Sequence, residues 1–422
     1  MKPKISFSEE QKDWIRRPLL SNIEKILDYR GRTPKKLGLN WSDKGYLALS
    51  ALNVKNGYID FNTDANYGNQ ELYDRWMGDN HLHKGQVVFT TEAPMGNVAQ
   101  IPNDDLYILS QRTIAFEVKH DLIREDFLAT LLCSPKVFNE LTSLSSGGTA
   151  KGVSQKSLSN LKVCVPVSLD EQSAIGSLFR TLDELLASYK NNLTNYQSLK
   201  ATMLSNMFPK VGQTVPEIRL DGFEEEWEKT TLEKSTDRVK SYSLSRDVET
   251  NQDTGIKYIH YGDIHLGKVS MIDDGNSIPY IKTDTKLSEF LQQGDLIFAD
   301  ASEDYKGIAE VAVIATALSE KIVAGLHTIA VRPYSIFDSI FLYYMFKTQT
   351  FRKYGYKVGT GMKVFGISPS NLMKYEFYYP DKKEQQVIGA YFSNLDNLIN
   401  SHQEKISQLE ILKKKLLQDM FI

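Results

Sequence analysis

The chain has 422 residues, which is too many for one ordinary hydrophobic core and enough for two or three domains. Apolar residues make up 41% and charged residues 24%, a composition typical of globular proteins. The formal net charge of −3 argues against a protein that binds nucleic acid by overall charge alone.

The sequence also predicts the cellular setting. No run of 18 apolar residues occurs, so no membrane span is expected, and the N-terminus lacks the apolar stretch of a secretory signal. Cys133 and Cys164 are too few for a disulfide framework. We therefore expect a cytoplasmic protein with no membrane association.

The first 165 residues combine short apolar runs with helical stretches. Residues 46–54, 85–90, 113–118 and 161–167 have the pattern of strands, whereas residues 124–144 have that of a helix. This mixture predicts an α+β domain with a mixed sheet.

A long helical segment follows, and a second copy of it ends the chain. EQSAIGSLFRTLDELLASY begins at Glu171, and EQQVIGAYFSNLDNLINSH begins at Glu384, an offset of 213 residues (384 − 171). The same offset relates Trp14 to Trp227. Weaker matches pair GQVVF with GDLIF and RTIAF with HTIAV, so the whole chain is a tandem repeat. We predict four parts: domains over 1–165 and 210–380, and long helices over 166–209 and 381–422.

Each long helix has apolar residues at alternating spacings of three and four. This 3.5-residue period predicts a coiled-coil seam, and a fused two-fold repeat predicts antiparallel pairing. Polar interruptions recur at Lys200 and Lys413. The alternative is that each helix only covers its own domain. The residues predicted to pair the helices and dock partners are Ile175, Phe179, Leu182, Leu186, Leu193, Ile388, Phe392, Leu395, Ile399 and Ile406.

Basic residues gather at equivalent places in both repeats. No acidic residue occurs between Glu140 and Asp170 or between Asp338 and Glu376, and both windows contain a glycine-rich turn. Lysine side chains and glycine-rich backbone suit phosphate groups. A basic turn, YRGRTPKK, adds to the first domain, and DRVKSYSLSR is its counterpart in the second. The alternative for each window is a solvated loop.

No catalytic motif is complete. Asp104, Glu117 and Lys119 have the acid-acid-lysine composition of metal-dependent nucleases, but the second repeat lacks this set. His81 and His83 have no third ligand nearby in sequence, so no metal site is predicted. No catalytic residue is predicted.

The duplicated EQ-x-x-IG-x-x-F-x-x-LD helix, ending in Met-Phe, resembles the specificity subunits of type I restriction-modification systems. The resemblance implies two similar target recognition domains separated by two long antiparallel coiled-coil helices, with pseudo-two-fold symmetry. It implies a non-enzymatic subunit that recognises a bipartite site on double-stranded DNA and docks two methyltransferase subunits. Motor and endonuclease subunits would join the full complex. No cofactor is expected in this chain, and S-adenosylmethionine is expected in the partner subunits.

Candidate DNA-binding residues come from basic and turn positions that recur in both repeats. They are Arg30, Arg32, Lys35, Lys36, Thr91, Arg112, Thr149 and Lys151 in the first domain, and Arg238, Lys240, Ser302, Lys306, His327, Lys357, Thr360 and Lys363 in the second. The remaining alternatives are a nuclease, a stand-alone DNA-binding protein and a coiled-coil scaffold without a nucleic-acid role.

Overall fold

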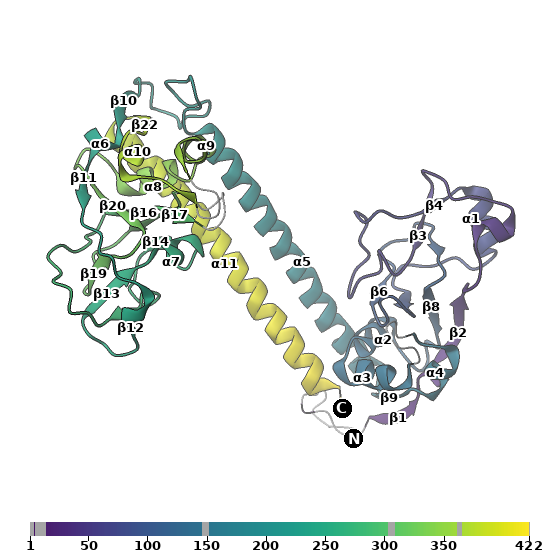
Figure 1. The fold of residues 1–422 in the computed structure, drawn as a ribbon. Coiled ribbons are helices and arrows are strands. Elements are labelled where there is room, and N and C mark those ends of the chain that lie inside the picture. The colour runs from purple at the N-terminus through teal and green to yellow at the C-terminus, as the bar shows by residue number, and fades with distance from the viewer. Residues whose placement is uncertain (1–3, 5–13, 146–151, 303–308, 361–364, 422) are drawn as a thin grey trace. The chain divides into compact units, whose positions relative to one another are not determined.

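The computed structural model describes residues 4, 14–145, 152–302, 309–360 and 365–421 (Figure 1). The chain divides into two compact units. Unit 1 comprises Met1–Asn191 and Gln403–Ile422, and unit 2 comprises Asn192–His402. Each unit contains one globular head, the first part of the long helix that follows that head, and the last part of the other long helix. The predicted limits of the four parts remain a prediction, because the units divide both long helices.

Head 1 is built from a four-stranded antiparallel sheet, a three-stranded mixed sheet and a two-stranded ribbon. The strand orders are β2-β8-β5-β6, β4-β3-β7 and β1-β9. Its strands are β1 (Ile15–Pro18), β2 (Ile23–Asp28), β3 (Tyr46–Leu49), β4 (Tyr67–Gly68), β5 (Val87–Thr90), β6 (Val98–Gln100), β7 (Ile108–Leu109), β8 (Thr113–Val118) and β9 (Lys162–Val165). Its helices are η1 (Leu19–Asn22), η2 (Pro34–Leu37), α1 (Gln70–Met77), α2 (Glu125–Leu132), α3 (Pro135–Leu144) and α4 (Gln155–Asn160).

Head 2 repeats this plan with additional strands. Its larger sheets have the orders β11-β20-β16-β18-β14 and β12-β15-β13-β19, and its ribbons pair β10 with β22 and β17 with β21. Its strands are β10 (Glu228–Thr231), β11 (Thr236–Val239), β12 (Glu249–Thr250), β13 (Ile256–Ile259), β14 (Met271–Ile272), β15 (Tyr280–Ile281), β16 (Leu296–Ala299), β17 (Ala301–Ser302), β18 (Val311–Ile314), β19 (Lys321–Ala324), β20 (Thr328–Pro333), β21 (Phe365–Gly366) and β22 (Glu376–Tyr379). Its helices are α6 (Leu232–Ser235), η3 (Arg246–Val248), α7 (Tyr261–His265), α8 (Ser339–Met345), α9 (Gln349–Val358) and α10 (Pro369–Met373).

The predicted α+β class and the internal repeat are confirmed, and one predicted helix is corrected. Residues 124–144 form two helices, α2 and α3, instead of one. The break has a local cause: the Ser134 side chain caps α3, and Pro135 occupies its first turn, where the missing N–H is tolerated.

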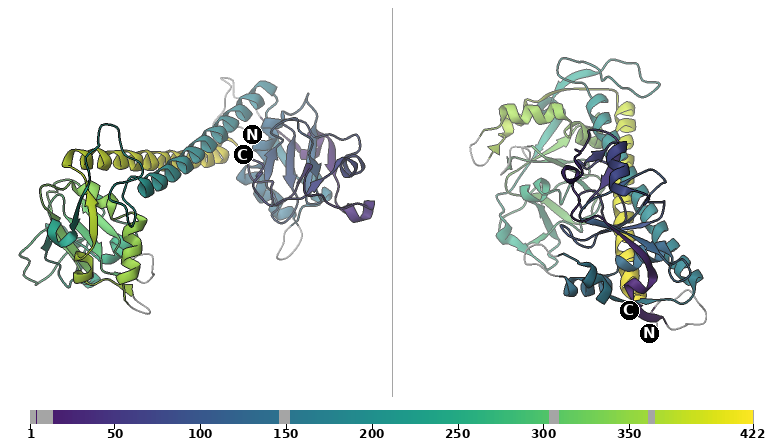
Figure 2. Two further views of the ribbon diagram at one scale, coloured as in Figure 1. Left: turned by 90° about the horizontal axis from the view of Figure 1, so that it is seen from above. Right: turned by 90° about the vertical axis from the view of Figure 1, so that its right-hand side faces the viewer.

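The two long helices are α5 (Leu169–Asn206), with 38 residues, and α11 (Lys382–Met420), with 39. In each unit they run side by side in opposite directions (Figures 1 and 2). In unit 1, Lys190 Nζ lies 2.7 Å from Glu410 Oε1. In unit 2, the rings of Tyr196 and His402 have centroids 5.2 Å apart. The predicted antiparallel pairing is therefore confirmed.

A buried glutamine attaches each long helix to its own head in the same way. Gln172 accepts a hydrogen bond from the backbone N–H of Arg124 at 2.9 Å and donates one to the Pro166 carbonyl at 2.9 Å. Gln385, 213 positions later, accepts from Asp338 N–H and donates to the Pro380 carbonyl, both at 2.8 Å. A fully buried amide must have partners, so these bonds explain the repeated Gln of the EQ motif.

The glycine of the same motif permits close packing of helix on helix. A Cβ at Gly176 would lie 2.4 Å from Asp126 Cβ, 2.9 Å from the Asp126 carbonyl carbon and 3.0 Å from Phe127 N. A Cβ at Gly389 would meet Asp338 Oδ1 at 3.1 Å and Phe341 N at 3.2 Å. The first approach is too close for any side chain, whereas the second requires only a small shift.

This difference predicts unequal effects of two equivalent substitutions. Gly176→Ala should destabilise unit 1 by about 1–3 kcal/mol, because backbone atoms of α2 must move. Gly389→Ala should be nearly neutral, because the helix propensity gained, about 1 kcal/mol, offsets the milder crowding. Thermal unfolding midpoints of the two variants measure the difference. Equal loss in both, or a larger loss for Gly389→Ala, would contradict this account of the packing.

Candidate nucleic-acid interface and helix pair

Three segments of head 1 meet at one end of its four-stranded sheet. Thr90 and Thr113 are paired where β5 ends and β8 begins. Beyond them, Thr91 N–H donates to the Arg112 carbonyl at 2.8 Å, and Val153 N–H donates to the Thr91 carbonyl at 2.9 Å. The loop after β5, the residue before β8 and the segment before α4 therefore form one junction.

Head 2 contains the same junction in the same register. Ala299 and Thr328 are paired where β16 ends and β20 begins. Asp300 N–H donates to the His327 carbonyl at 3.0 Å, and Ile367 N–H donates to the Asp300 carbonyl at 2.8 Å. The hydrogen-bond pattern makes Arg112 and His327 structurally equivalent, as the RTIAF and HTIAV match predicts.

The side chain of each of these two residues contacts a carboxylate across its junction. Arg112 Nε lies 3.1 Å from Glu92 Oε1, and His327 Nδ1 lies 3.1 Å from Asp300 Oδ1. Burial raises the pKa of Asp300, and the nearby His327 opposes that shift. The two carboxylates were not among the predicted site residues; their only sequence signal is an acidic residue shortly after the GQVVF and GDLIF strands.

The basic turn of head 1 is held against the junction. Arg30 Nε donates to Asp28 Oδ1 at 2.9 Å, and Arg30 Nη1 donates to the Val153 carbonyl at 3.2 Å. Burial alone would raise the pKa of Asp28, but hydrogen bonds from Arg30 and Gln155 lower it. A charged Asp28 orients the guanidinium.

The other predicted basic residues of head 1 differ in availability. Arg32 donates to the Trp76 carbonyl and lies 4.6 Å over the Tyr29 ring. Lys35 and Lys36 are exposed on η2, where Lys36 Nζ donates to the Gly31 carbonyl at 2.7 Å. Both lysines are therefore accessible to phosphate.

In head 2, Arg238 is exposed on β11, and Lys240 lies 5.1 Å over the Tyr242 ring. Lys357 is exposed at the end of α9, and Thr360 is exposed in a backbone bridge to Gly366.

Two predicted residues are corrected. Thr91 is 1% exposed and Ser302 is fully buried, so neither hydroxyl is placed to contact a base. Thr91 Oγ1 lies 3.2 Å from the Arg112 carbonyl, and Ser302 Oγ lies 3.4 Å from His265 Nδ1. The neighbouring residues Thr90 and Ala301 are buried as well, so burial at these places does not follow strand alternation and the sequence did not indicate it. Thr149, Lys151, Lys306 and Lys363 lie outside the described residues.

In the folded chain, two basic residues of the acid-free window of head 2 lie beside an acidic residue from outside that window. Lys347 and Arg352 both pair with Glu310. Burial would raise the pKa of Glu310, but the two cations outweigh it and lower that pKa. Long-range pairing that the window did not reveal therefore neutralises part of its charge.

The helix pair contains a reciprocal set of ion pairs. Lys200 of α5 pairs with Asp396 of α11 in unit 2, and Lys413 of α11 pairs with Asp183 of α5 in unit 1. Both residues of one pair lie 213 positions from their counterparts in the other (413 − 200, 396 − 183). The polar interruptions of the seam therefore bind equivalent partners, which favours one register of pairing.

The seam residues divide into two groups by their surroundings. Ile175, Phe179 and Leu182 are buried in the core of head 1, and Ile388, Phe392 and Leu395 are buried in the core of head 2. Leu186 and Ile399 are also buried, whereas Leu193 and Ile406 are half-buried. The first turns of each long helix thus cover the head that precedes the helix. Further along, the two helices pair with each other, so the helix residues serve both for covering a head and for a coiled-coil seam.

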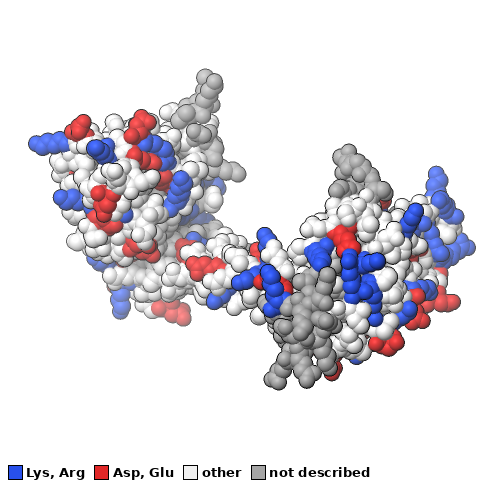
Figure 3. All heavy atoms as spheres, turned by 90° about the horizontal axis from the view of Figure 1, so that it is seen from below, with Lys and Arg blue, Asp and Glu red and all other residues white. Residues whose placement is uncertain are grey.

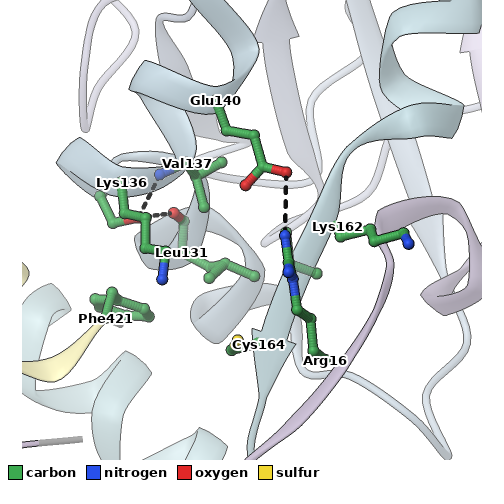
Figure 4. Close-up of a pocket in the computed structure, with 10 residues that line it drawn as sticks. Arg16, Leu131, Lys136, Val137, Glu140, Lys162, Cys164 and Phe421 are labelled. Atoms are coloured by element: carbon green, nitrogen blue, oxygen red, sulfur yellow. Dashed lines mark hydrogen bonds and ion pairs between the residues drawn. The ribbon is translucent and has the colours of Figure 1, made fainter. Parts of the chain in front are cut away.

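Two hollows in the described part of the chain do not resemble a substrate site. One, lined by Arg16, Glu140 and Phe421 among others, has a volume of about 10 Å³, room for a single water (Figure 4). Arg16 Nη2 lies 3.7 Å from Glu140 Oε1 across it. Another, beside Arg332 and Tyr334, is wider at about 260 Å³, but it is open.

The nuclease and metal alternatives receive no support from the geometry. Lys119 Nζ donates to the Ser21 carbonyl at 3.2 Å, and Asp104 Oδ1 accepts from Lys84 N–H at 3.2 Å. His81 and His83 have separate partners, Tyr73 and Glu125. Among the residues the structure describes, no group of three His, Cys, Asp or Glu side chains could hold a metal ion. None of the described helices is long and apolar enough to cross a membrane.

Charge is mixed over the surface. In the view of Figure 3, Lys and Arg side chains are interspersed with Asp and Glu on both heads. This distribution agrees with the net charge of −3 and predicts a weak sequence-independent contribution to DNA affinity.

Comparison with known proteins identifies the class. The family model described as the type I restriction modification DNA specificity domain matches residues 20–196 and again residues 224–411. The two matches cover most of the chain and coincide with the two repeats. The chain therefore belongs to the family of type I restriction-modification specificity subunits.

Individual relatives are distant in sequence. The MjaVIII specificity subunit of Methanocaldococcus jannaschii is 21% identical over 318 residues, which are 74% of this chain and 72% of that protein. The MjaIX specificity subunit of the same organism is 33% identical over 84 residues, 20% of this chain and 19% of that protein.

Solved structures share the fold. The S subunit of a type I restriction-modification system from M. genitalium superposes with a TM-score of 0.62 at 16% identity, covering 100% of this chain and 99% of that one. A chain from a study of complex assembly and conformational transition of the type I R-M system has a TM-score of 0.50 at 17% identity, with 96% of both chains covered.

The Lys200–Asp396 and Lys413–Asp183 pairs should contribute unequally to the free energy of unfolding. Asp396 also accepts a hydrogen bond from the buried Tyr344 hydroxyl at 2.7 Å, and burial together with Asp396 raises the pKa of that hydroxyl. Asp396→Ala should therefore cost about 1–3 kcal/mol, because a buried hydroxyl loses its partner. Asp183→Ala, the matched control, should cost about 0–1 kcal/mol, because the Asp183 side chain is 37% exposed and that of Asp396 only 27%.

Thermal or denaturant unfolding midpoints measure both costs. In a Tyr344→Phe background the cost of Asp396→Ala should fall, which a double-mutant cycle detects. An unchanged cost in that background would contradict the assigned role of the hydroxyl.

Proposed function

We propose that this chain is the DNA-specificity subunit of a type I restriction-modification complex. Each head recognises one half of a bipartite site on double-stranded DNA, and the helix pair holds the heads and docks two methyltransferase subunits. The observation that carries the proposal is the duplicated junction: two heads of one fold present different exposed side chains, Arg112 and His327, at the same backbone position.

The division of labour follows from how proteins recognise DNA. Phosphate contacts position a protein on the duplex, and contacts to base edges specify the sequence. The exposed Lys35 and Lys36 of head 1, and Arg238 and Lys357 of head 2, are suited to phosphate. Side chains at the junctions are suited to base edges, so each head can have its own preference.

The chain is proposed to be non-catalytic, and chemistry is assigned to its partners. No complete catalytic constellation was found among the described residues. The methyltransferase subunits would bind S-adenosylmethionine and modify adenine, and motor and endonuclease subunits would cut unmodified DNA. With a net charge of −3, this chain would depend on those partners for much of its contact with phosphate.

Equivalent exposed leucines support docking of two copies of one partner. Leu185 and Leu398, related by the repeat (398 − 185 = 213), are both 42% exposed. Leu199 and Leu412, related by the same offset, are 37% and 44% exposed. Exposed leucines on a helix are suited to burial in a protein interface. Leu185 and Leu412 belong to unit 1, whereas Leu199 and Leu398 belong to unit 2.

The function is tested by mapping methyladenine in the DNA of cells that express the methyltransferase subunit with and without this chain. We expect a bipartite methylated motif that appears only when the chain is present. If the two proteins are soluble and associate, yet no motif depends on the chain, the proposal fails and a scaffold role is favoured.

The docking surfaces are tested by the stoichiometry of the complex. Leu185→Glu combined with Leu412→Glu should remove one of two bound methyltransferase subunits, because a charge replaces apolar contact in unit 1 only. Ala187→Glu combined with Ser407→Glu, at exposed positions of unit 1 on other faces of the same two helices, is the matched control and should leave two subunits bound. Native mass spectrometry measures the ratio. Two subunits retained by the leucine variant would exclude this surface.

A further inference from the structure

The side chains of Arg112 and His327 project from the same point of the two sheets. Each immediately precedes a threonine that is buried, Thr113 in head 1 and Thr328 in head 2. By contrast, the Arg112 and His327 side chains are 57% and 51% exposed. At this edge of each sheet a buried residue is therefore followed, toward the N-terminus, by a side chain that is accessible to a ligand.

Both side chains are oriented by a carboxylate, but the carboxylate comes from a different position in each head. In head 1 it belongs to Glu92, one residue beyond Thr91. In head 2 it belongs to Asp300, which has the backbone position of Thr91. The residue equivalent to Glu92 is Ala301, because Glu92 bridges Gly152 as Ala301 bridges Gly366. In both heads a carboxylate thus contacts the exposed side chain, although the two carboxylates come from non-equivalent positions of the chain.

His327 is held more rigidly than its equivalent. Its backbone is left-handed, with φ of 55°, a conformation in which histidine is more common than most other non-glycine residues. The edge of its ring contacts Tyr261, with centroids 5.4 Å apart and planes at 85°. Tyr261 in turn packs on His260, with centroids 4.5 Å apart. The imidazole is therefore fixed by backbone, carboxylate and aromatic ring together.

We propose that Arg112 and His327 are the equivalent base-recognising residues of the two heads. This inference rests on the proposed function and assigns its specificity to one position in each head. Arginine offers only donors in a planar fork, which matches the O6 and N7 acceptors of guanine. Histidine cannot form that two-pronged contact, so the corresponding base pair of the second half-site follows a different preference.

The experiment selects DNA from a library with both half-sites randomised, using the assembled complex of this chain and its methyltransferase subunits. His327→Arg should change the preference at one base pair of the second half-site toward guanine, by about tenfold, and leave the first half-site unchanged. Arg112→His should remove a preference at one base pair of the first half-site and leave the second unchanged.

Two controls separate recognition from charge. Arg16→His on β1 and Lys229→Arg on β10 alter exposed cations, equivalent in the repeat, that also pair with carboxylates, Glu140 and Glu376, away from the junctions. Both controls should leave the selected motif unchanged. His327→Asn, which tolerates a left-handed backbone, keeps the test decisive if His327→Arg does not fold; it should abolish the preference at that same base pair.

The outcomes distinguish the two levels of the account. If the unmodified complex selects no bipartite motif, the proposed function fails. If it selects a motif that both junction variants leave unchanged, or whose base pairs all weaken uniformly, the function stands and the assignment of Arg112 and His327 is overturned.

Discussion

A Met-Phe pair lies at the end of each long helix, and the structure depends on the burial of both pairs. The pair at the end of α5 lies in the core of unit 2, and the pair at the end of α11 lies in the core of unit 1. Phe421, just after α11, packs against Trp14 and Phe127 of head 1, with ring centroids 5.9 and 5.8 Å away. Phe208, just after α5, packs against Phe341 and Phe392 of head 2, at 5.4 and 5.8 Å. Residues at the two long helices therefore contribute to both cores.

This exchange explains why the helices are conserved within the chain while the heads differ. A helix that must fit two cores and one partner helix is constrained along much of its length, by Gln172, Gly176 and the reciprocal lysine–aspartate pairs. The rim of each sheet carries no such constraint. Arg112 in one head and His327 in the other share a backbone position but differ in chemistry, as the proposed recognition of two different half-sites requires.

The sequence predicted the architecture well because its signals were periodic or duplicated. The 3.5-residue spacing predicted the long helices, and the 213-residue offset predicted two similar heads. Prediction of the site was poorer, because side-chain direction and long-range partners are properties of the folded chain. Thr91 and Ser302 resembled polar turn residues but are buried, and Lys347 and Arg352 form ion pairs with Glu310, which is distant in sequence.

We propose that the paired helices, which hold the heads, also set their spacing on DNA, and this is tested most directly by lengthening both helices equally. One heptad would be duplicated in each, residues 187–193 in α5 and 400–406 in α11, which adds about 10 Å at 1.5 Å per residue. Because DNA rises about 3.4 Å per base pair, the methylated motif should keep both half-sites and gain about three base pairs between them. An unchanged gap, with the complex assembled and active, would contradict the account.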